Sequence, residues 1–150
     1  MMNKSVKLGI QGRPDVPPRL FDLVPRYIEK YGYKDCLFAG KVNKQWVKYD
    51  GKKFYEITNS ISYGLLKLGV KKGDRIALIA NNAPEWNMID FAIQQVGAIC
   101  IPIYPTISHD DYKYIFNHSE ASIAFFTNKH LYSKVADIIA DIPTIKETYL

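Results

Sequence analysis

The strongest constraint on the fold is an alternation of short apolar runs and amphipathic segments in the second half of the chain. Apolar runs occupy residues 76–80, 98–103 and 122–126, and the segments between them carry apolar residues every three or four positions. Continuous apolar runs are typical of strands covered on both faces, and strands that alternate with helices form parallel sheets. The sequence therefore predicts an α/β fold with a mainly parallel sheet and flanking helices.

The segments that follow these runs carry helix signals of their own. Helices are predicted over 84–96, from Ser108 onwards, and as a single helix around 131–139. Ser108 and Asp111, three residues apart, form the pattern of a capping box. The apolar side chains of that helix are expected to point inward: Tyr112, Ile115 and Phe116. Because the chain stops inside a last strand pattern at 145–150, we expect the 150 residues to be a piece of a larger protein.

A helix, a β-hairpin and a second helix are predicted ahead of the sheet. Residues 20–32 indicate a short helix, in which Asp22 can cap the start and Gly32 suits the end. Two β-type runs flank residues 41–44, which is typical of a hairpin. Residues 52–68 carry apolar residues spaced by three and four, as an amphipathic helix does.

The domain organisation predicted from these signals is simple. Residues 1–19, rich in proline and glycine, are expected to form an extended N-terminal arm. Residues 20–150 are expected to form one α/β domain or subdomain, truncated at its C-terminal end. A chain of 150 residues, 47% of them hydrophobic, can bury a core and does not have the composition of a disordered protein.

The net charge of +5 is unevenly distributed along the chain. Residues 1–75 carry sixteen Lys and Arg against seven Asp and Glu, whereas residues 76–150 carry four against eight. A basic half can face nucleic acid, an acidic membrane or a polyphosphate. The lysines are scattered and accompany no nucleic-acid-binding motif, so nucleic acid is not an expected partner. Peripheral contact of the basic half with the inner face of an anionic membrane stays open.

Cysteine usage and hydropathy favour the cytoplasm. Cys36 and Cys100 lie far apart in apolar runs and are expected to be buried free thiols, as in a reducing compartment. No apolar run approaches the roughly 20 residues of a membrane-spanning helix. The first twenty residues lack the long apolar stretch of a signal peptide.

The hexapeptide 81–86, Asn-Asn-Ala-Pro-Glu-Trp, directly follows the first apolar run, which is where ligands of α/β proteins commonly bind. It contains no glycine that would let a phosphate approach the backbone. Asn82 and Glu85 can form an Asn-based capping box, with Pro84 in the first turn and Trp86 opening the buried face. We therefore interpret the hexapeptide as a helix cap rather than a ligand site.

No catalytic, cofactor-binding or metal-binding residue is predicted in this chain. The strand-to-helix loops lack glycine and no Gly-rich phosphate motif occurs, which disfavours a small nucleotide-binding domain. His109, His118 and His130 lack the spacing, and the neighbouring cysteines, of a metal site. Helix caps and exposed surface account for all three histidines.

Several short signatures nevertheless occur in the order and spacing of a known family. They are Leu68-Gly69-Val70, Gly73-Asp74, Asn82-Ala83-Pro84-Glu85-Trp86, Gly97-Ala98, Pro102-Ile103-Tyr104-Pro105-Thr106 with Ser108, and the segment 114–121. Over about residues 20–150 the chain resembles the early N-terminal region of adenylate-forming enzymes, and most closely the long-chain fatty acyl-CoA synthetases. Ala83 departs from the arginine that long-chain members often carry at this position.

This resemblance implies a subdomain of the large N-terminal domain of an adenylate-forming enzyme. The full-length parent would use ATP, Mg²⁺ and CoA to convert a fatty acid into an acyl-adenylate and then an acyl-CoA. The family's Ser/Thr/Gly-rich loop and catalytic lysine have no match here, so the 150 residues alone are expected to be inactive and to hold no cofactor. The expected partners are the remainder of the same polypeptide and, through exposed apolar surface, further copies. The alternative is a stand-alone α/β binding or interaction module without enzymatic activity.

Overall fold

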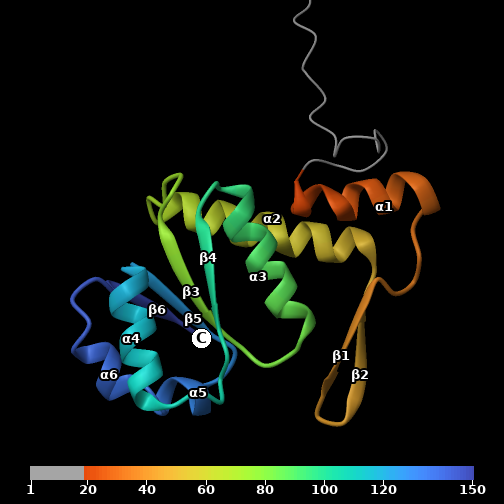
Figure 1. The fold of residues 1–150 in the computed structure, drawn as a ribbon. Coiled ribbons are helices and arrows are strands. Elements are labelled where there is room, and N and C mark those ends of the chain that lie inside the picture. The colour runs from red at the N-terminus through yellow and green to blue at the C-terminus, as the bar shows by residue number, and fades with distance from the viewer. Residues whose placement is uncertain (1–18) are drawn as a thin grey trace, which may run out of the picture.

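A four-stranded parallel sheet forms the centre of the molecule (Figure 1). The computed structural model describes residues 19–150, so the predicted arm lies outside the described residues except for Arg19. The strand order is β4-β3-β5-β6, with β3 at Arg75–Ile79, β4 at Ile99–Ile103, β5 at Ile123–Phe126 and β6 at Glu147–Tyr149. Every pairing between these strands is parallel, which confirms the predicted fold class.

Helices cover both faces of this sheet because successive side chains of a strand point to opposite faces. Ile76 of β3 packs in a cluster with α2 (Gly51–Lys67) and α3 (Pro84–Gln95). Ile79, three residues later, packs in the opposite cluster with α4 (His109–Ser119), α5 (Lys129–Ser133) and α6 (Ala136–Ala140). The sheet is therefore the middle of three layers.

The apolar runs do not share one environment, although they look alike in sequence. In β3, residues 76–79 are completely buried, because strands lie on either side and helices cover both faces. β4 is an edge strand, and its Ile99 is 48% exposed. Complete coverage of the second apolar run is thus not observed in the described chain.

The single helix predicted around 131–139 is wrong, because two short helices, α5 and α6, occupy this region. The break falls at Val135, whose φ of −130° and ψ of 7° leave the helical region. Its N–H bonds to the carbonyl of Tyr132, three residues back, and its side chain is completely buried. The helix is thus interrupted at a β-branched residue whose side chain lies in the core.

A helical turn and helix precede the hairpin: η1 (Leu20–Asp22) and α1 (Leu23–Tyr31). Asp22 occupies the N-cap position of α1 but makes no capping bond, since its carboxylate pairs with Arg19 at 2.7 Å. The predicted capping of this helix by the Asp22 side chain is therefore wrong. Gly32 ends the helix as expected, with a φ of 72°.

The predicted hairpin is present as β1 (Phe38–Val42) and β2 (Gln45–Tyr49). Its two-residue turn, Asn43-Lys44, has φ values of 50° and 65°, as a type I′ turn requires. Phe38 stacks on Phe54 of α2 with ring centroids 4.6 Å apart. This contact belongs to a third apolar cluster, which ties the hairpin and α1 to α2 and α3.

Helix α2 begins one residue earlier than predicted, at Gly51. The reason is a cap that the apolar spacing does not reveal. The carboxylate of Asp50 accepts a hydrogen bond from the backbone N–H of Lys53 at 2.7 Å. An aspartate at this position satisfies one of the free N–H groups of the first turn.

The capping box predicted for α4 is confirmed. The Ser108 side chain accepts from the backbone N–H of Asp111, whose carboxylate accepts from the backbone N–H of Ser108. We expect Ser108→Ala to lower the free energy of unfolding by about 1 kcal/mol, because the backbone N–H of Asp111 loses its side-chain acceptor. Urea denaturation measures this change. Ser60→Ala, a mid-helix serine exposed to solvent, should be nearly neutral, and equal losses for both variants would contradict the assignment.

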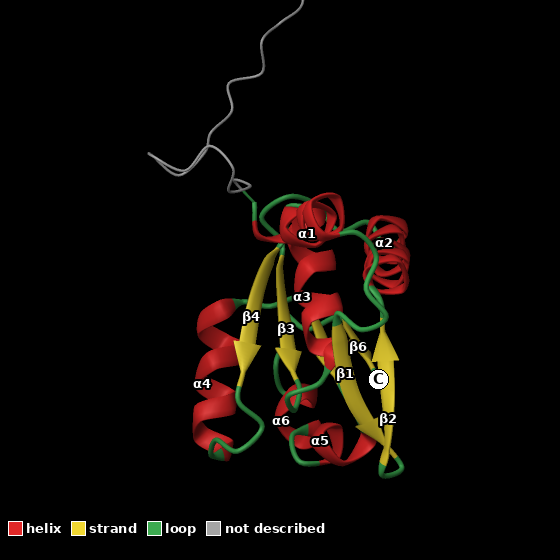
Figure 2. Ribbon diagram, turned by 90° about the vertical axis from the view of Figure 1, so that its right-hand side faces the viewer, coloured by secondary structure: helices red, strands yellow, loops and turns green. Residues whose placement is uncertain are grey.

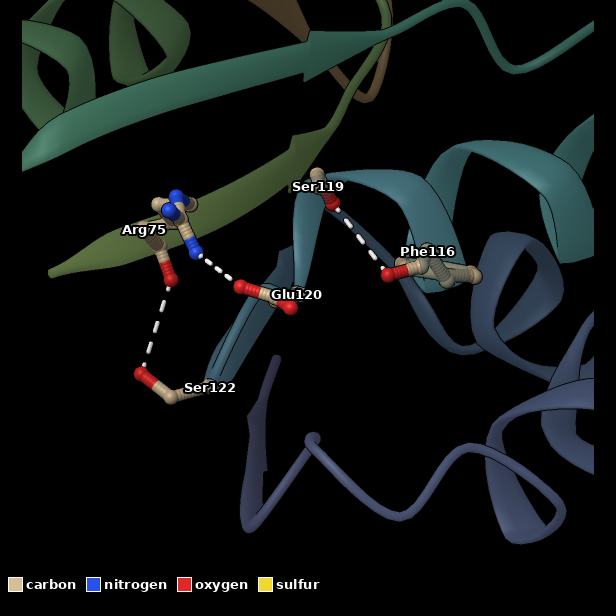
Figure 3. A network of polar contacts seen from close by, with 5 residues as sticks. All are labelled: Arg75, Phe116, Ser119, Glu120 and Ser122. Atoms are coloured by element: carbon tan, nitrogen blue, oxygen red, sulfur yellow. Dashed lines mark hydrogen bonds and ion pairs between the residues drawn. The ribbon is translucent and has the colours of Figure 1, made fainter.

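Polar contacts close the amino-terminal edge of the sheet (Figure 3). Arg75 at the start of β3 pairs with Glu120 at 2.6 Å, and the Ser122 hydroxyl lies 3.5 Å from the Arg75 carbonyl oxygen. Glu120 ends α4 in the left-handed conformation, with a φ of 51°. The strand-to-helix loops gather at the opposite, carboxyl-terminal edge, which is where ligands of open α/β sheets bind.

Candidate functional site

A cleft of about 870 Å³ opens at the carboxyl-terminal ends of β3 and β4. In Figure 2 the arrowheads of these two strands point to the same end of the molecule. Three segments line the cleft: the start of β1, residues 80–84 with Trp86 and Asn87 between β3 and the first turns of α3, and residues 102–106 at the end of β4. Ligands of open α/β sheets bind outside the carboxyl ends of strands, so this is the candidate functional site.

The lining of the cleft is electrically neutral. It combines aromatic and aliphatic side chains with a few amides and hydroxyls: Phe38, Trp86, Ile103, Asn81, Asn87 and Thr106 are representative. None of the residues that line it is Lys, Arg, His, Asp or Glu. Polyphosphates are bound by cations, metal ions and glycine-rich backbone, so this lining does not fit the triphosphate of ATP or a Mg²⁺ ion.

The capping box predicted for the hexapeptide 81–86 is wrong. Helix α3 begins at Pro84, its N-cap is Ala83, and no side chain bonds to that cap. Ala83 is extended, with a φ of −153° and a ψ of 157°, because a residue before proline avoids the helical region. Asn82 consequently lies one residue too early to cap the helix. The hexapeptide lines the cleft instead.

Glu85 finds its partner in the hairpin rather than in its own helix. The Tyr49 hydroxyl of β2 donates a hydrogen bond of 2.8 Å to Glu85 Oε1, across 36 positions of sequence. This bond raises the pKa of the Tyr49 phenol, because the neutral phenol donates to the carboxylate, and partial burial raises it further. The contact holds β2 against the first turn of α3, beside the cleft.

Removing this hydroxyl with Tyr49→Phe should lower the free energy of unfolding by about 1 kcal/mol, since the bond has a charged acceptor but is partly exposed. Because the pKa of Tyr49 is raised in the folded protein, the hydrogen bond stabilises the fold fully at pH values below about 10, the ordinary pKa of a phenol. This stabilisation is lost as the pH rises through the raised pKa of Tyr49. Urea denaturation of both proteins across this range tests it. Tyr63→Phe, whose ring is exposed, is the control, and a pH-independent difference for Tyr49→Phe would contradict the assignment.

The two cysteines are free, as predicted, but they are not both buried. Cys36 is exposed ahead of β1, and Cys100 in β4 is partly buried beside α3. Burial raises the pKa of the Cys100 thiol, and the nearby Asp90 carboxylate raises it further. Asp90 itself is buried and accepts a hydrogen bond from Gln94 at 2.8 Å. Cys100 is therefore held as a neutral thiol, which is neither a nucleophile nor a metal ligand.

The structure leaves the three histidines apart from one another and away from the cleft. His109 lies 4.0 Å from Asp137, His118 stacks on Tyr114, and His130 is exposed at the start of α5. Nowhere in residues 19–150 do three or more His, Cys, Asp or Glu side chains gather in a way that could hold a metal ion. Among the described helices, none is both long and apolar enough to cross a bilayer.

Sequence reasoning did not find this cleft. Asn87 belongs to no motif, and Tyr104 and Thr106 belong to a family signature to which no binding role was assigned. Their common signal is position, since the loops after two adjacent parallel strands open at the same edge of the sheet. Phe38 carries no such signal, because only the docking of the hairpin brings β1 to this edge.

Several curated proteins that the chain is similar to are long-chain acyl-CoA ligases or synthetases. The long-chain-fatty-acid–CoA ligase FadD15 of Mycobacterium bovis is 36% identical over 84 residues, which is 56% of this chain and 14% of the relative. Fatty acyl-CoA synthetase A of Dictyostelium discoideum is 32% identical over 101 residues, or 67% of this chain and 15% of the relative. Long chain acyl-CoA synthetase 4 of Arabidopsis thaliana is 27% identical over 94% of this chain and 24% of its own length. The chain thus spans a quarter or less of these relatives.

Solved structures share the fold of the chain, and a family model matches most of its length. The chain matches the long-chain-fatty-acid–CoA ligase FadD1 of Archaeoglobus fulgidus with a TM-score of 0.73 and 21% identity, covering 87% of this chain and 27% of that one. It matches the anthranilate CoA ligase AuaEII with a TM-score of 0.74 and 20% identity, over 87% and 24% of the two chains. These likenesses confirm the fold. The family model of AMP-binding enzymes matches residues 25–149, and the chain therefore belongs to the AMP-binding enzyme family.

Proposed function

We propose that this chain is one part of an ATP-dependent long-chain fatty acid–CoA ligase. Such an enzyme joins a fatty acid to the α-phosphate of ATP with release of pyrophosphate, and the CoA thiol then displaces AMP. The observation that carries the proposal is the match of residues 25–149 to the AMP-binding enzymes, of which the relatives named above are long-chain ligases. ATP, Mg²⁺, CoA and the fatty acid are the proposed substrates and metal ion of the whole enzyme.

In this proposal the chain contributes part of the fold and an uncharged cleft. Its cleft offers amides, aromatic rings and aliphatic surface, and it lacks the charged groups that a triphosphate needs. We therefore assign the handling of ATP and Mg²⁺ to other parts of the enzyme. The remainder of the same polypeptide is the principal partner in this proposal. Two free thiols support a reducing compartment, and we place the enzyme in the cytoplasm.

An exchange assay tests the proposed division of labour. The 150-residue chain should catalyse no fatty-acid-dependent exchange of pyrophosphate into ATP, and calorimetry should detect no micromolar ATP binding. Any such exchange would refute the assignment of the chemistry to other segments. The coding sequence after Leu150 tests the parent enzyme separately. A Ser/Thr/Gly-rich loop ending in lysine within a few tens of codons supports the ligase, and its absence favours a stand-alone binding module.

Exposed apolar side chains at the free edge of the sheet predict self-association of the chain on its own. Ile99 on β4 and Tyr114 on α4 are exposed and lie on either side of a shallow groove. We expect the weight-average mass in sedimentation equilibrium to rise with concentration, because contact between copies removes this surface from water. The double variant Ile99→Ser, Tyr114→Ser should weaken the association. Leu66→Ser, an exposed site on α2, should not, and a strict monomer at all concentrations would contradict the prediction.

A further inference from the structure

The β1–β2 hairpin carries an unpartnered surface that neither the cleft nor the sheet uses. Figure 1 shows the hairpin extending away from α2, with its turn at the far end. At that end Trp46 is 64% exposed and Val42 is 52% exposed. A tryptophan left in water needs explanation, because large aromatic rings contribute most when they are covered.

Strand register places the exposed charges of the hairpin beside this ring. Lys41 lies directly opposite Trp46, and Lys48 lies opposite Ala39, on the same face because paired residues share a face. The Lys41 ammonium lies 5.0 Å from the centre of the Trp46 ring. The opposite face is occupied, since Phe38 stacks on Phe54. We define the hairpin face as Lys41, Trp46 and Lys48, together with Lys44 in the turn.

The hairpin face is purely basic. Residues 36–49 contain three lysines and no aspartate or glutamate. All three lysines are exposed, and in the described part of the chain none of them has a carboxylate within ion-pair distance. The acidic residues of the chain concentrate instead in 76–150. The positive charge at the hairpin face is therefore uncompensated and available to an anionic partner.

We propose that the hairpin face binds the surface of an anionic lipid bilayer. Lysine ammonium groups would meet the lipid phosphates, while the Trp46 ring enters the boundary between headgroups and acyl chains, where tryptophan is favoured. A single-stranded nucleic acid fits less well, because it calls for several aromatic rings along a positively charged groove, and the hairpin face has one ring. This inference does not depend on the proposed ligase activity.

Vesicle binding tests the proposal on the whole 150-residue chain. The chain should bind vesicles of phosphatidylcholine mixed with phosphatidylglycerol, should not bind phosphatidylcholine alone, and should be released by salt. Lys41→Gln with Lys44→Gln should weaken binding about 25-fold, from about fivefold for each lysine at an anionic surface. Lys113→Gln with Lys129→Gln, the same charge change in the acidic half, should leave the affinity within about twofold, because both sites lie outside the hairpin face.

Fluorescence locates the contact independently of affinity. In Trp86→Phe the remaining tryptophan is Trp46, and its emission should shift to the blue and be quenched by brominated lipids when anionic vesicles are added. Three outcomes overturn the proposal: equal losses from the two lysine pairs, no spectral change of Trp46 on bound vesicles, or no binding even at low salt. Tighter binding to an oligonucleotide, lost in the same Lys41 and Lys44 variant, would assign the hairpin face to nucleic acid instead.

Discussion

Replacing Phe54 with alanine is expected to lower the free energy of unfolding by about 3–5 kcal/mol, the largest effect of any single substitution considered. Phe54 is completely buried in α2 and stacks on Phe38 of the hairpin. Its ring also meets Phe91 of α3 edge-on, with centroids 5.9 Å apart. The truncation removes aromatic surface from the core and leaves a cavity between α2, α3 and the hairpin. Urea denaturation at constant pH measures the loss.

A neighbouring aromatic residue provides the control for this change. Tyr55 follows Phe54 in the same helix, but its side chain is 39% exposed. Tyr55→Ala should cost less than about 1 kcal/mol, because little buried surface is lost and alanine is the better helix former. If both variants lost the same stability, packing of Phe54 in the third cluster would not explain the result. A selective loss in Phe54→Ala should also increase the hydrogen exchange of the hairpin amides.

Adding one methyl group at Gly40 is expected to cost about 1–3 kcal/mol and to displace the hairpin. A Cβ atom at this position would lie 2.8 Å from Pro84 Cδ, closer than side-chain atoms tolerate. The proline ring cannot move aside without moving the start of α3, so β1 must shift instead. The hairpin and Pro84 both line the cleft, and Gly40→Ala should therefore also widen it. Urea denaturation and the emission of Trp86 report the two effects.

A glycine-to-alanine substitution at Gly64 should stabilise the protein instead of destabilising it. Gly64 lies within α2, and a Cβ atom added there meets no atom within 4 Å. Gly64→Ala should raise the free energy of unfolding by about 0.5–1 kcal/mol, because alanine restricts the unfolded chain and favours the helix. A stabilising Gly40→Ala would show that the close approach of the hairpin to Pro84 is not tight.

Local patterns predicted most of the elements of the fold. The apolar runs became β3, β4 and β5, and the Ser108 and Asp111 pair became the cap of α4, because both signals act within a few residues. The family signatures likewise lie in short local segments, and the match over residues 25–149 confirmed the family. The division of the chain into an arm and an α/β domain stays a prediction.

The failures of prediction occur where a neighbouring residue or a tertiary contact overrides a helix signal. Asn82 and Glu85 have the residue types of a capping box, but Pro84 forces Ala83 into an extended conformation and Tyr49 takes the carboxylate. The buried side chain of Val135 divides one predicted helix into two. The contact of Glu85 with Tyr49 spans 36 positions and could not be seen from the hexapeptide alone.

The sequence by itself determined the type and order of the elements, the capping of α4, the turn of the hairpin and the family, because these depend on residues that are close along the chain. The tertiary structure alone decided that β3 is central and β4 is an edge, since two similar apolar runs differ only in their neighbours. It also decided that the hairpin docks against α3 and that the hexapeptide 81–86 lines a neutral cleft. Such a cleft depends on contacts between segments more than thirty residues apart, which no local pattern encodes.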